Sequence, residues 1–438
     1  MERRCSRRKV LADGAGVAGL AAVTTPLLAA CRLGPVGAPA QAAPVKLVFG
    51  RRSSAAELSV LEKYMAAYRQ VAPHVTIELV AFPAGLQEMR QGLIAAFAGG
   101  TGPDLFISDG PWLPEFANKG LLDPMPDRIS RDLKANFTDG GQRYGTYKGV
   151  SYVYPYETVV HGLYYNRTLF AQAGLDPSKP PRNFAEFRDY ARRTAKSDSA
   201  GNLAVAGFIG NNRLLYVENF VYNNGGRVIN EDEYGNLRRP YRLTLGEPPA
   251  LAALQLHYDL YNTDRSATTR PGPDFQQGTV AMQVLTNGNV GTIKQRAPTL
   301  DYGVAPLPTQ LSFPAHQLGG WSWGVAKPGT RKDPAWTLLQ WLNSKENILQ
   351  YVEALAAVST HKGVIADPRA VAADPERMKV FYQVLPRITH VRPKAVVWSE
   401  IEALVEPEVT RMFNGEMTPR QLLDKVEGPV NALLAKEP

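Results

Sequence analysis

The sequence predicts an α/β protein with a parallel sheet, because three strand-like segments alternate with two helix-like segments early in the chain. The segments at 45–49, 75–80 and 103–107 are short, mainly apolar runs of β-branched, leucine and aromatic residues, which is typical of strands. Between them, apolar residues recur at helical spacing over 58–71 and 86–97. A strand–helix–strand–helix–strand order implies parallel strands joined by right-handed crossovers.

Capping and stop signals mark several of the predicted helices. Pro73 ends the first one. Asn183, with Glu186 three residues later, predicts the N-cap of a helix further along the chain. Asp333 and Thr418 each precede a proline, which is the usual pairing of an N-cap with proline at the first helical position.

Length and charge limit the class of protein. A chain of 438 residues is too long for one hydrophobic core and indicates two lobes. It carries 49 Lys and Arg against 41 Asp and Glu, a formal net charge of +8, and the basic residues form no stripe. Nucleic acid is therefore not an expected partner.

Cysteine and histidine usage predicts no metal site, cofactor or disulfide in the folded body. The chain holds two cysteines, Cys5 and Cys31, both near its start. The six histidines are scattered, with no pair four residues apart that would suggest metal ligands on a helix.

The first 31 residues read as an export signal with a lipid attachment site. Arg7 and Arg8 form a twin-arginine pair, an uncharged apolar stretch follows, and Leu-Ala-Ala-Cys31 resembles a bacterial lipobox. We expect residues 1–30 to be a signal peptide, Cys31 to carry lipid, and 31–44 to be a flexible linker. This places the protein on the outer face of the cell membrane. Val10 replaces the Phe often found in twin-arginine leaders, so the general secretory route stays open.

The same leader contains a glycine pattern that fits a dinucleotide-binding fingerprint, Gly14-x-Gly16-x-x-Gly19. That motif needs an acidic residue about 20 positions further on to bind the ribose. No Asp or Glu occurs between Asp13 and Glu57. A flavin or nicotinamide cofactor is therefore not expected.

The carboxyl end of the third strand is the first place to look for a ligand site. In open parallel sheets, ligands bind beyond the carboxyl ends of the strands. Asp109 lies there, as a ligand group or as a turn residue beside Gly110. Trp112 is expected to line the same site or to cap a lobe. Trp321 is the best candidate to stack on a ligand, although Trp323, two residues along a strand, would share its face.

Several motifs together resemble the extracellular sugar-binding lipoproteins of ABC importers, the extracellular solute-binding protein family 1 that includes maltose-binding proteins. The resemblance spans roughly residues 45 to 435. It is carried in order by the segments 102–112, 154–157, 163–175, 275–282, 302–308 and 318–321.

The resemblance implies two α/β lobes of the type II periplasmic-binding-protein fold, with a ligand cleft between them and a hinge of several strands. We expect lobe 1 to comprise 45–157 and 306–345, and lobe 2 to comprise 158–305 and 346–438. Closure of such lobes around a ligand is a recognised domain motion.

The resemblance also suggests ligand residues. Glu157 lies where the family often places a hydroxyl acceptor, unless it forms a hinge salt bridge. Trp398 resembles the aromatic residue that the second lobe contributes, and Phe220 and Tyr222 occupy a stretch where an aromatic ring commonly contacts ligand.

One departure concerns the segment after Met282, where the family usually has Gly-x-Trp and this chain has none. Asn287 and Asn289 are expected to hydrogen-bond to ligand there instead.

The function predicted from these observations is a non-enzymatic binding protein that captures a carbohydrate, with an oligosaccharide as the expected ligand, and delivers it to the permease subunits of an ABC transporter. We expect a monomer. The alternatives are a binder of another solute (polyamine, peptide, organophosphate, or iron through Tyr164 and Tyr165) and a secreted glycoside hydrolase using Asp109 and Glu157.

Overall fold

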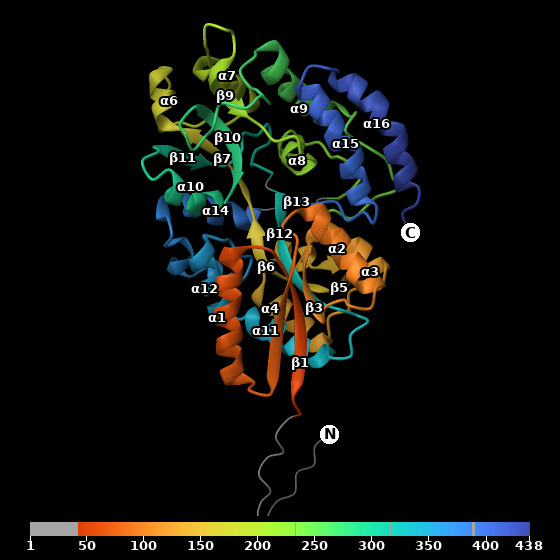
Figure 1. Cartoon of the computed structure of the whole chain (residues 1–438). Helices are drawn as coiled ribbons and strands as arrows, with labels where there is room; N and C mark the ends of the chain where they lie inside the picture. The colour runs from red at the N-terminus through yellow and green to blue at the C-terminus, as the bar shows by residue number, and fades with distance from the viewer. Residues whose placement is uncertain (1–42, 233, 316, 388–389) are drawn as a thin grey trace, which may run out of the picture. The chain divides into compact units, whose positions relative to one another are not determined.

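The computed structural model describes residues 43–232, 234–315, 317–387 and 390–438. The predicted signal peptide, Cys31 and most of the predicted linker lie outside these residues. The described chain builds two mixed α/β regions, each around its own sheet (Figure 1).

The first sheet contains the strands predicted at the start of the chain. Its order is β13-β12-β3-β1-β2, and β6 also pairs with β12. Its strands are β1 (Val45–Arg52), β2 (Val75–Phe82), β3 (Leu105–Asp109), β6 (Val153–Val159), β12 (Gln317–Val325) and β13 (His390–Val391). Strand β1 runs parallel to both β2 and β3, so the predicted parallel arrangement is confirmed.

The second sheet has the order β11-β7-β10-β9-β8. Its strands are β7 (His161–Asn166), β8 (Lys196–Ser197), β9 (Leu203–Ile209), β10 (Val280–Thr286) and β11 (Tyr302–Ala305). A separate short hairpin pairs β4 (Thr146–Tyr147) with β5 (Val150–Ser151).

Helices cover both sheets. They are α1 (Ala55–Val71), α2 (Leu86–Ala98), α3 (Leu113–Asn118), α4 (Asp127–Asn136), α5 (Asp139–Tyr144), α6 (Arg167–Gln172), α7 (Phe184–Thr194), α8 (Leu214–Asn223), α9 (Pro248–Tyr258), α10 (Asn289–Arg296), α11 (Lys332–Leu342), α12 (Lys345–Leu355), α13 (Lys362–Ile365), α14 (Pro375–Val384), α15 (Trp398–Phe413) and α16 (Pro419–Leu434). Short 3-10 turns occur at η1 (Gly110–Trp112), η3 (Pro368–Val371) and η4 (Leu385–Arg387), and a π-turn, η2 (Asp259–Thr263), follows α9. None of the helices in the described ranges is long and apolar enough to cross a membrane.

Two of the predicted helix starts are confirmed and one is wrong. The Asn183 side chain caps α7 by accepting a hydrogen bond from the Glu186 backbone N–H, and Thr418 caps α16 with a complete capping box. Helix α11, however, begins at Lys332 with Arg331 at its N-cap, so Asp333 is not the cap. The structure offers a reason, because Arg331 and Lys332 are held at the helix start by ion pairs to Asp104 and Asp123.

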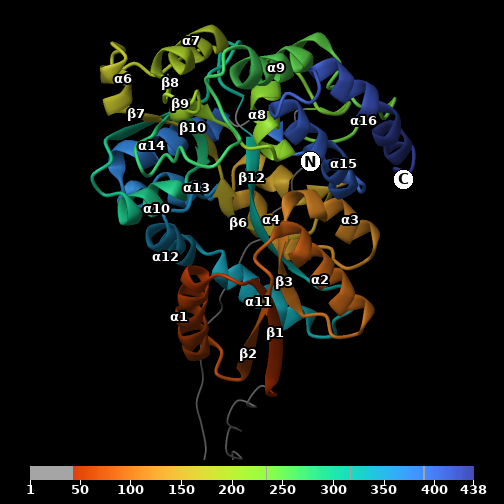
Figure 2. The ribbon, with the colours of Figure 1, turned by 45° about the horizontal axis from the view of Figure 1, so that its top comes forward.

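Two large sets of buried side chains match the two sheets. One gathers around the first sheet and includes Phe49, Phe106 and Trp323. The other gathers around the second sheet and includes Phe208 and Trp398. In Figures 1 and 2, α1, α2 and α11 lie with the first sheet, whereas α7, α9, α15 and α16 lie with the second.

The chain passes from sheet to sheet at identifiable points. Strand β6 ends at Val159 in the first sheet, and β7 begins at His161 in the second. The chain returns between β11 and β12, and β13 later adds to the first sheet beside β12. Helix α12 contacts α1 and α11. The boundaries of the two lobes stay a prediction.

Candidate functional site

Three of the predicted ligand residues lie side by side on neighbouring strands. Strand β12 runs between β3 and β6, and Trp321 pairs with Asp109 on one side and with Glu157 on the other. Residues directly opposite each other on paired strands project from the same face of the sheet. We call Asp109, Trp321 and Glu157 the Trp321 row. It lies at the carboxyl end of β3, where the sequence predicted a site.

The Trp321 indole is held by contacts on two sides. The Trp112 ring meets it edge-on, with the ring centroids 6.0 Å apart, and the Arg52 guanidinium lies 4.6 Å from its centroid. Arg52 is the last residue of β1, so it reaches the row from another strand end of the same sheet. Trp321 is 9% exposed and Trp112 is 2% exposed. A ligand ring could reach the indole only if the groups around it move apart.

Trp323 belongs to the core of the first sheet. Its ring stacks on Tyr156 at 3.8 Å and meets Phe49 edge-on at 5.9 Å. It is 2% exposed. Of the two tryptophans, Trp321 is therefore the one among polar side chains.

Glu157 is surrounded by groups that donate to carboxylates. Tyr351 donates a hydrogen bond to its Oε2 at 3.0 Å. Burial raises the pKa of Glu157, while the nearby Arg52 guanidinium lowers it. Arg52 also pairs with Glu57 at 3.2 Å, and Tyr156 donates to the other oxygen of Glu57.

Asp109 is fixed by three neighbours. Its Oδ1 accepts from the Gly110 backbone N–H at 3.0 Å and faces the Tyr144 hydroxyl at 3.4 Å. Its Oδ2 pairs with Arg392 at 3.2 Å. Burial raises the pKa of Asp109, and the Arg392 guanidinium lowers it. Tyr144 also donates to the Gly320 carbonyl, which links β12 to this turn.

Arg392 joins the Trp321 row to helices that cover the second sheet. Its guanidinium pairs with Glu402 on α15, and its Nε lies 3.8 Å from Glu218 on α8. We call Arg392, Asp109, Glu218 and Glu402 the Arg392 cluster. Burial raises the pKa of Glu218 to about 7, and the Gln317 amide donates to this carboxylate.

Gly320 explains how β12 and β6 approach each other. Its φ is +139°, and a Cβ at this position would lie 2.1 Å from the Glu157 carbonyl oxygen. Only glycine fits so close to a neighbouring backbone. Gly320 thus permits the close pairing of β12 with β6 beside Trp321.

The predicted aromatic residues of the second half do not join the Trp321 row. Phe220 lies among aromatic rings, 4.5 Å from the His257 centroid and 5.7 Å from that of Phe187. Tyr222 donates to Glu231 at 2.9 Å. Trp398 is fully buried in the second core. We call Phe220, Tyr222 and Trp398 the second-sheet aromatics, and their role as ligand contacts stays a prediction.

The two predicted asparagines contact the protein backbone. Asn287 accepts from the Val160 N–H at 2.9 Å, at the passage from β6 to β7, and faces the Ala356 carbonyl. Asn289 accepts from the N–H and the hydroxyl of Thr286 at the end of β10. Ligand binding by these amides also stays a prediction.

The structure adds residues that the sequence analysis did not select as ligand groups. Arg52 could have been noticed, because it ends a strand of the same sheet. Glu218 could have been noticed as the one acidic residue of helix α8. Tyr144, Tyr351 and Glu402 carry no local signal, since only the fold brings them to the row.

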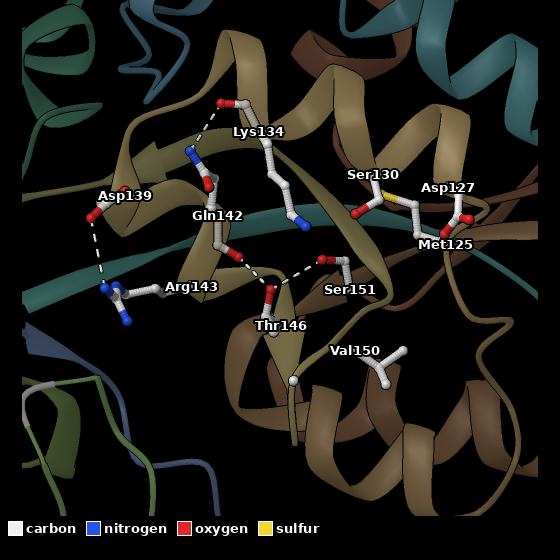
Figure 3. Close-up of a pocket in the computed structure, with 11 residues that line it drawn as sticks. Met125, Asp127, Ser130, Lys134, Asp139, Gln142, Arg143, Thr146, Val150 and Ser151 are labelled. Carbon is white, nitrogen blue, oxygen red and sulfur yellow. Dashed lines mark hydrogen bonds and ion pairs between the residues drawn. The ribbon is translucent and has the colours of Figure 1, made fainter.

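Two cavities lie away from the Trp321 row. One of about 450 Å³ is formed by α4, α5 and the β4–β5 hairpin (Figure 3). Figure 3 shows that its polar groups contact each other, as in the Asp139–Arg143 ion pair at 3.6 Å and the Thr146–Ser151 contact at 3.2 Å. Another of about 550 Å³ lies between residues 180–183 and 305–314. Neither is lined by a predicted ligand residue.

In the part of the chain that the structure describes, no three His, Cys, Asp or Glu side chains are grouped to hold an ion. The two tyrosines considered for iron contact other residues of the protein, and Tyr165 stacks on Phe170. Tyr164 donates to the Thr286 carbonyl at 2.7 Å and stacks on Tyr302.

A two-lobed α/β protein with a row of polar and aromatic groups at its strand ends, facing helices of the other region, has the architecture of a solute-binding protein. The chain belongs to the bacterial extracellular solute-binding protein family, whose model matches residues 52–348. The predicted family and the predicted two-lobed fold are confirmed. Membership also places the protein outside the cytoplasm.

Individual relatives are distant. A maltotriose-binding protein of Pyrococcus abyssi is 22% identical over 383 residues, covering 82% of this chain and 77% of the relative. The sn-glycerol-3-phosphate-binding periplasmic protein UgpB of Pectobacterium atrosepticum is 26% identical over 303 residues, covering 64% and 66%. A solute-binding protein of an ABC transporter from Thermotoga lettingae, solved with α-D-tagatose, superimposes with a TM-score of 0.74 at 24% identity, covering 89% and 99%.

Proposed function

We propose that this protein is the carbohydrate receptor of an ABC importer. It captures an oligosaccharide between its two lobes and delivers it unchanged to the permease subunits. The proposal includes attachment to the membrane by lipid on Cys31, a monomeric state and the absence of catalysis.

The Trp321 row is the observation that carries the proposal. A sugar presents hydroxyl groups in fixed directions and an apolar C–H face. Asp109 and Glu157 offer carboxylate acceptors on either side of the Trp321 indole, which offers a flat apolar surface. Charge-assisted hydrogen bonds to buried carboxylates are about twice as strong as neutral ones.

Contacts between the two regions support a mechanism of closure. Asp109 on the first sheet pairs with Arg392, which in turn pairs with Glu402 on α15. The row is nearly sealed by these contacts, so binding requires the two regions to separate and then to close again. A closed shape that depends on bound solute is a signal that a permease can recognise.

The relatives support a carbohydrate as the solute, since one is named for maltotriose and one was solved with tagatose. The UgpB relative is named for glycerol 3-phosphate, which keeps a phosphate ester as the alternative solute.

A thermal-melt screen tests the proposal. The purified protein is heated with mono- and oligosaccharides, glycerol 3-phosphate, amino acids, polyamines and ferric iron. A ligand at 100 times its Kd adds about 2.7 kcal/mol to the free energy of unfolding and raises the melting temperature. A shift with one sugar class, with intact sugar recovered, supports the proposal. A shift only with a non-sugar solute contradicts it, and cleaved sugar would favour a glycoside hydrolase.

A further inference from the structure

Acidic side chains outnumber basic ones two to one around the Trp321 row and the Arg392 cluster. Six carboxylates face three guanidinium groups there. The carboxylates are Glu57, Asp109, Glu157, Glu218, Glu402 and Glu406, and the guanidinium groups are Arg52, Arg213 and Arg392.

Each of these guanidinium groups already faces carboxylates of the protein. Arg392 is shared by Asp109, Glu402 and Glu218. Arg52 pairs with Glu57. Arg213 acts electrostatically on both Asp109 and Glu406. An anionic ligand would have to compete with these carboxylates for every cation.

One of the carboxylates, Glu218, has an oxygen without a hydrogen-bond donor among the described residues. Glu218 is fully buried, and this oxygen is its Oε1. A buried carboxylate oxygen without a donor is costly, and a ligand that donates to it removes that cost. Sugar hydroxyls and amines donate hydrogen bonds, whereas an ionised phosphate only accepts them.

The Arg52 guanidinium is engaged on two sides. It lies over the Trp321 indole ring, 4.6 Å from the centroid, and pairs with Glu57. The aromatic face stabilises this cation in place. An anionic ligand would therefore have to draw Arg52 away from both partners.

We infer that this interface binds solutes without negative charge, that is uncharged carbohydrates and amine-bearing solutes, and excludes phosphate esters. The inference rests on the proposed function, which places the binding site here. It attributes the discrimination against anionic solutes to the excess carboxylates of the Arg392 cluster. Like charges brought together at a binding interface cost several kcal/mol, which corresponds to a discrimination on the order of 100-fold or more.

The test compares neutral, anionic and cationic probes at about pH 8, where Glu218 is ionised. Maltotriose, mannotriose, glycerol 3-phosphate and spermidine are titrated into the whole protein by calorimetry. The same titrations use Glu218→Gln and Glu402→Gln, each of which removes one negative charge and keeps the side-chain shape. Glu400→Gln, an exposed residue on the same helix as Glu402, is the matched control.

Binding of a trisaccharide to the wild type, with glycerol 3-phosphate at least about 100-fold weaker, is the expected result. Removing either buried carboxylate should strengthen binding of glycerol 3-phosphate by about tenfold, and Glu400→Gln should leave it unchanged. Two independent variants keep the test valid if one of them fails to fold.

The other outcomes separate this inference from the proposed function. Equal binding of a trisaccharide and glycerol 3-phosphate overturns the inference and leaves the carbohydrate receptor standing. Binding of glycerol 3-phosphate without any sugar overturns both. Binding of spermidine alone supports the charge selection and overturns the carbohydrate proposal. Unchanged glycerol 3-phosphate affinity in both variants overturns the role of the carboxylates.

Discussion

The Trp321 row and the second-sheet aromatics were predicted for the same role, yet their surroundings differ. Asp109, Trp321 and Glu157 lie together among charged groups, and Glu157 retains partial exposure. Trp398 is packed in an apolar core, and Phe220 lies among aromatic rings. We therefore propose ligand contact for the first group first, while the contacts of Trp398 and Phe220 show packing with the second core.

The difference follows from the elements that carry the residues. On a strand, pairing with its neighbours fixes which face a side chain occupies, so residues at matched positions of three strands must meet. On a helix, the burial pattern decides the face. Helix α8 is buried on nearly all sides, so an aromatic residue on it packs against the core whichever way it points. Aromatic identity alone therefore does not distinguish a residue on a paired strand from one packed in a helical core.

Substitution of Trp398 should give the largest effect on stability. Trp398→Ala leaves a cavity in the second core and is expected to lower the free energy of unfolding by about 3–5 kcal/mol. Chemical denaturation measures this, with Trp398→Phe as the milder control. A loss below about 1 kcal/mol would show that the site is not a packed core.

The second core should also make the protein sensitive to acid. Burial lowers the pKa of His257 from 6.5 to about 4. The unfolded chain then binds a proton that the folded chain rejects, so stability falls as the pH drops from about 6.5 to 4, by roughly 3 kcal/mol. His257→Phe should flatten the pH profile of unfolding over this window. His74→Gln, at an exposed position, should leave the profile unchanged.

In the Trp321 row, the expected effect is on binding. Glu157→Gln removes the charge of a hydroxyl acceptor and should weaken binding of the sugar found in the thermal screen by about tenfold, or about 1.4 kcal/mol. Titration calorimetry measures the change, and Glu400→Gln is the surface control. Unchanged affinity in Glu157→Gln would instead favour the hinge role for this residue.

The smallest effect is expected at a helix end far from the row. Thr418→Ala removes the capping box of α16 and should cost about 1 kcal/mol of unfolding free energy. Sugar affinity should not change. If sugar affinity fell together with stability, ligand binding would depend on the second region as well as on the Trp321 row.

The sequence predicted what depends on local pattern. Strands β1, β2 and β3, the helices between them and the caps at Asn183 and Thr418 follow from periodicity and turn chemistry. Asp109 was selected because ligands bind at strand ends, a rule that needs only the order of elements, and its role as a ligand group stays a prediction.

Long-range pairing could not be predicted. Arg392 meets Asp109 across 283 positions of the chain, and no local pattern encodes that meeting. The cap at Asp333 was mispredicted for a similar reason, because Arg331 and Lys332 bind acidic residues about 210 to 230 positions away, which shifts the helix start. Local propensity gives way to tertiary contacts at such positions.

The most direct test of the account compares one tryptophan from each region. Titration calorimetry with the sugar found in the thermal screen is run on Trp321→Ala and on Trp398→Phe. We expect Trp321→Ala to weaken binding at least about tenfold, whereas Trp398→Phe should stay within about threefold of the wild type. Strong loss in Trp398→Phe with unchanged affinity in Trp321→Ala would contradict it and move the site to the second region.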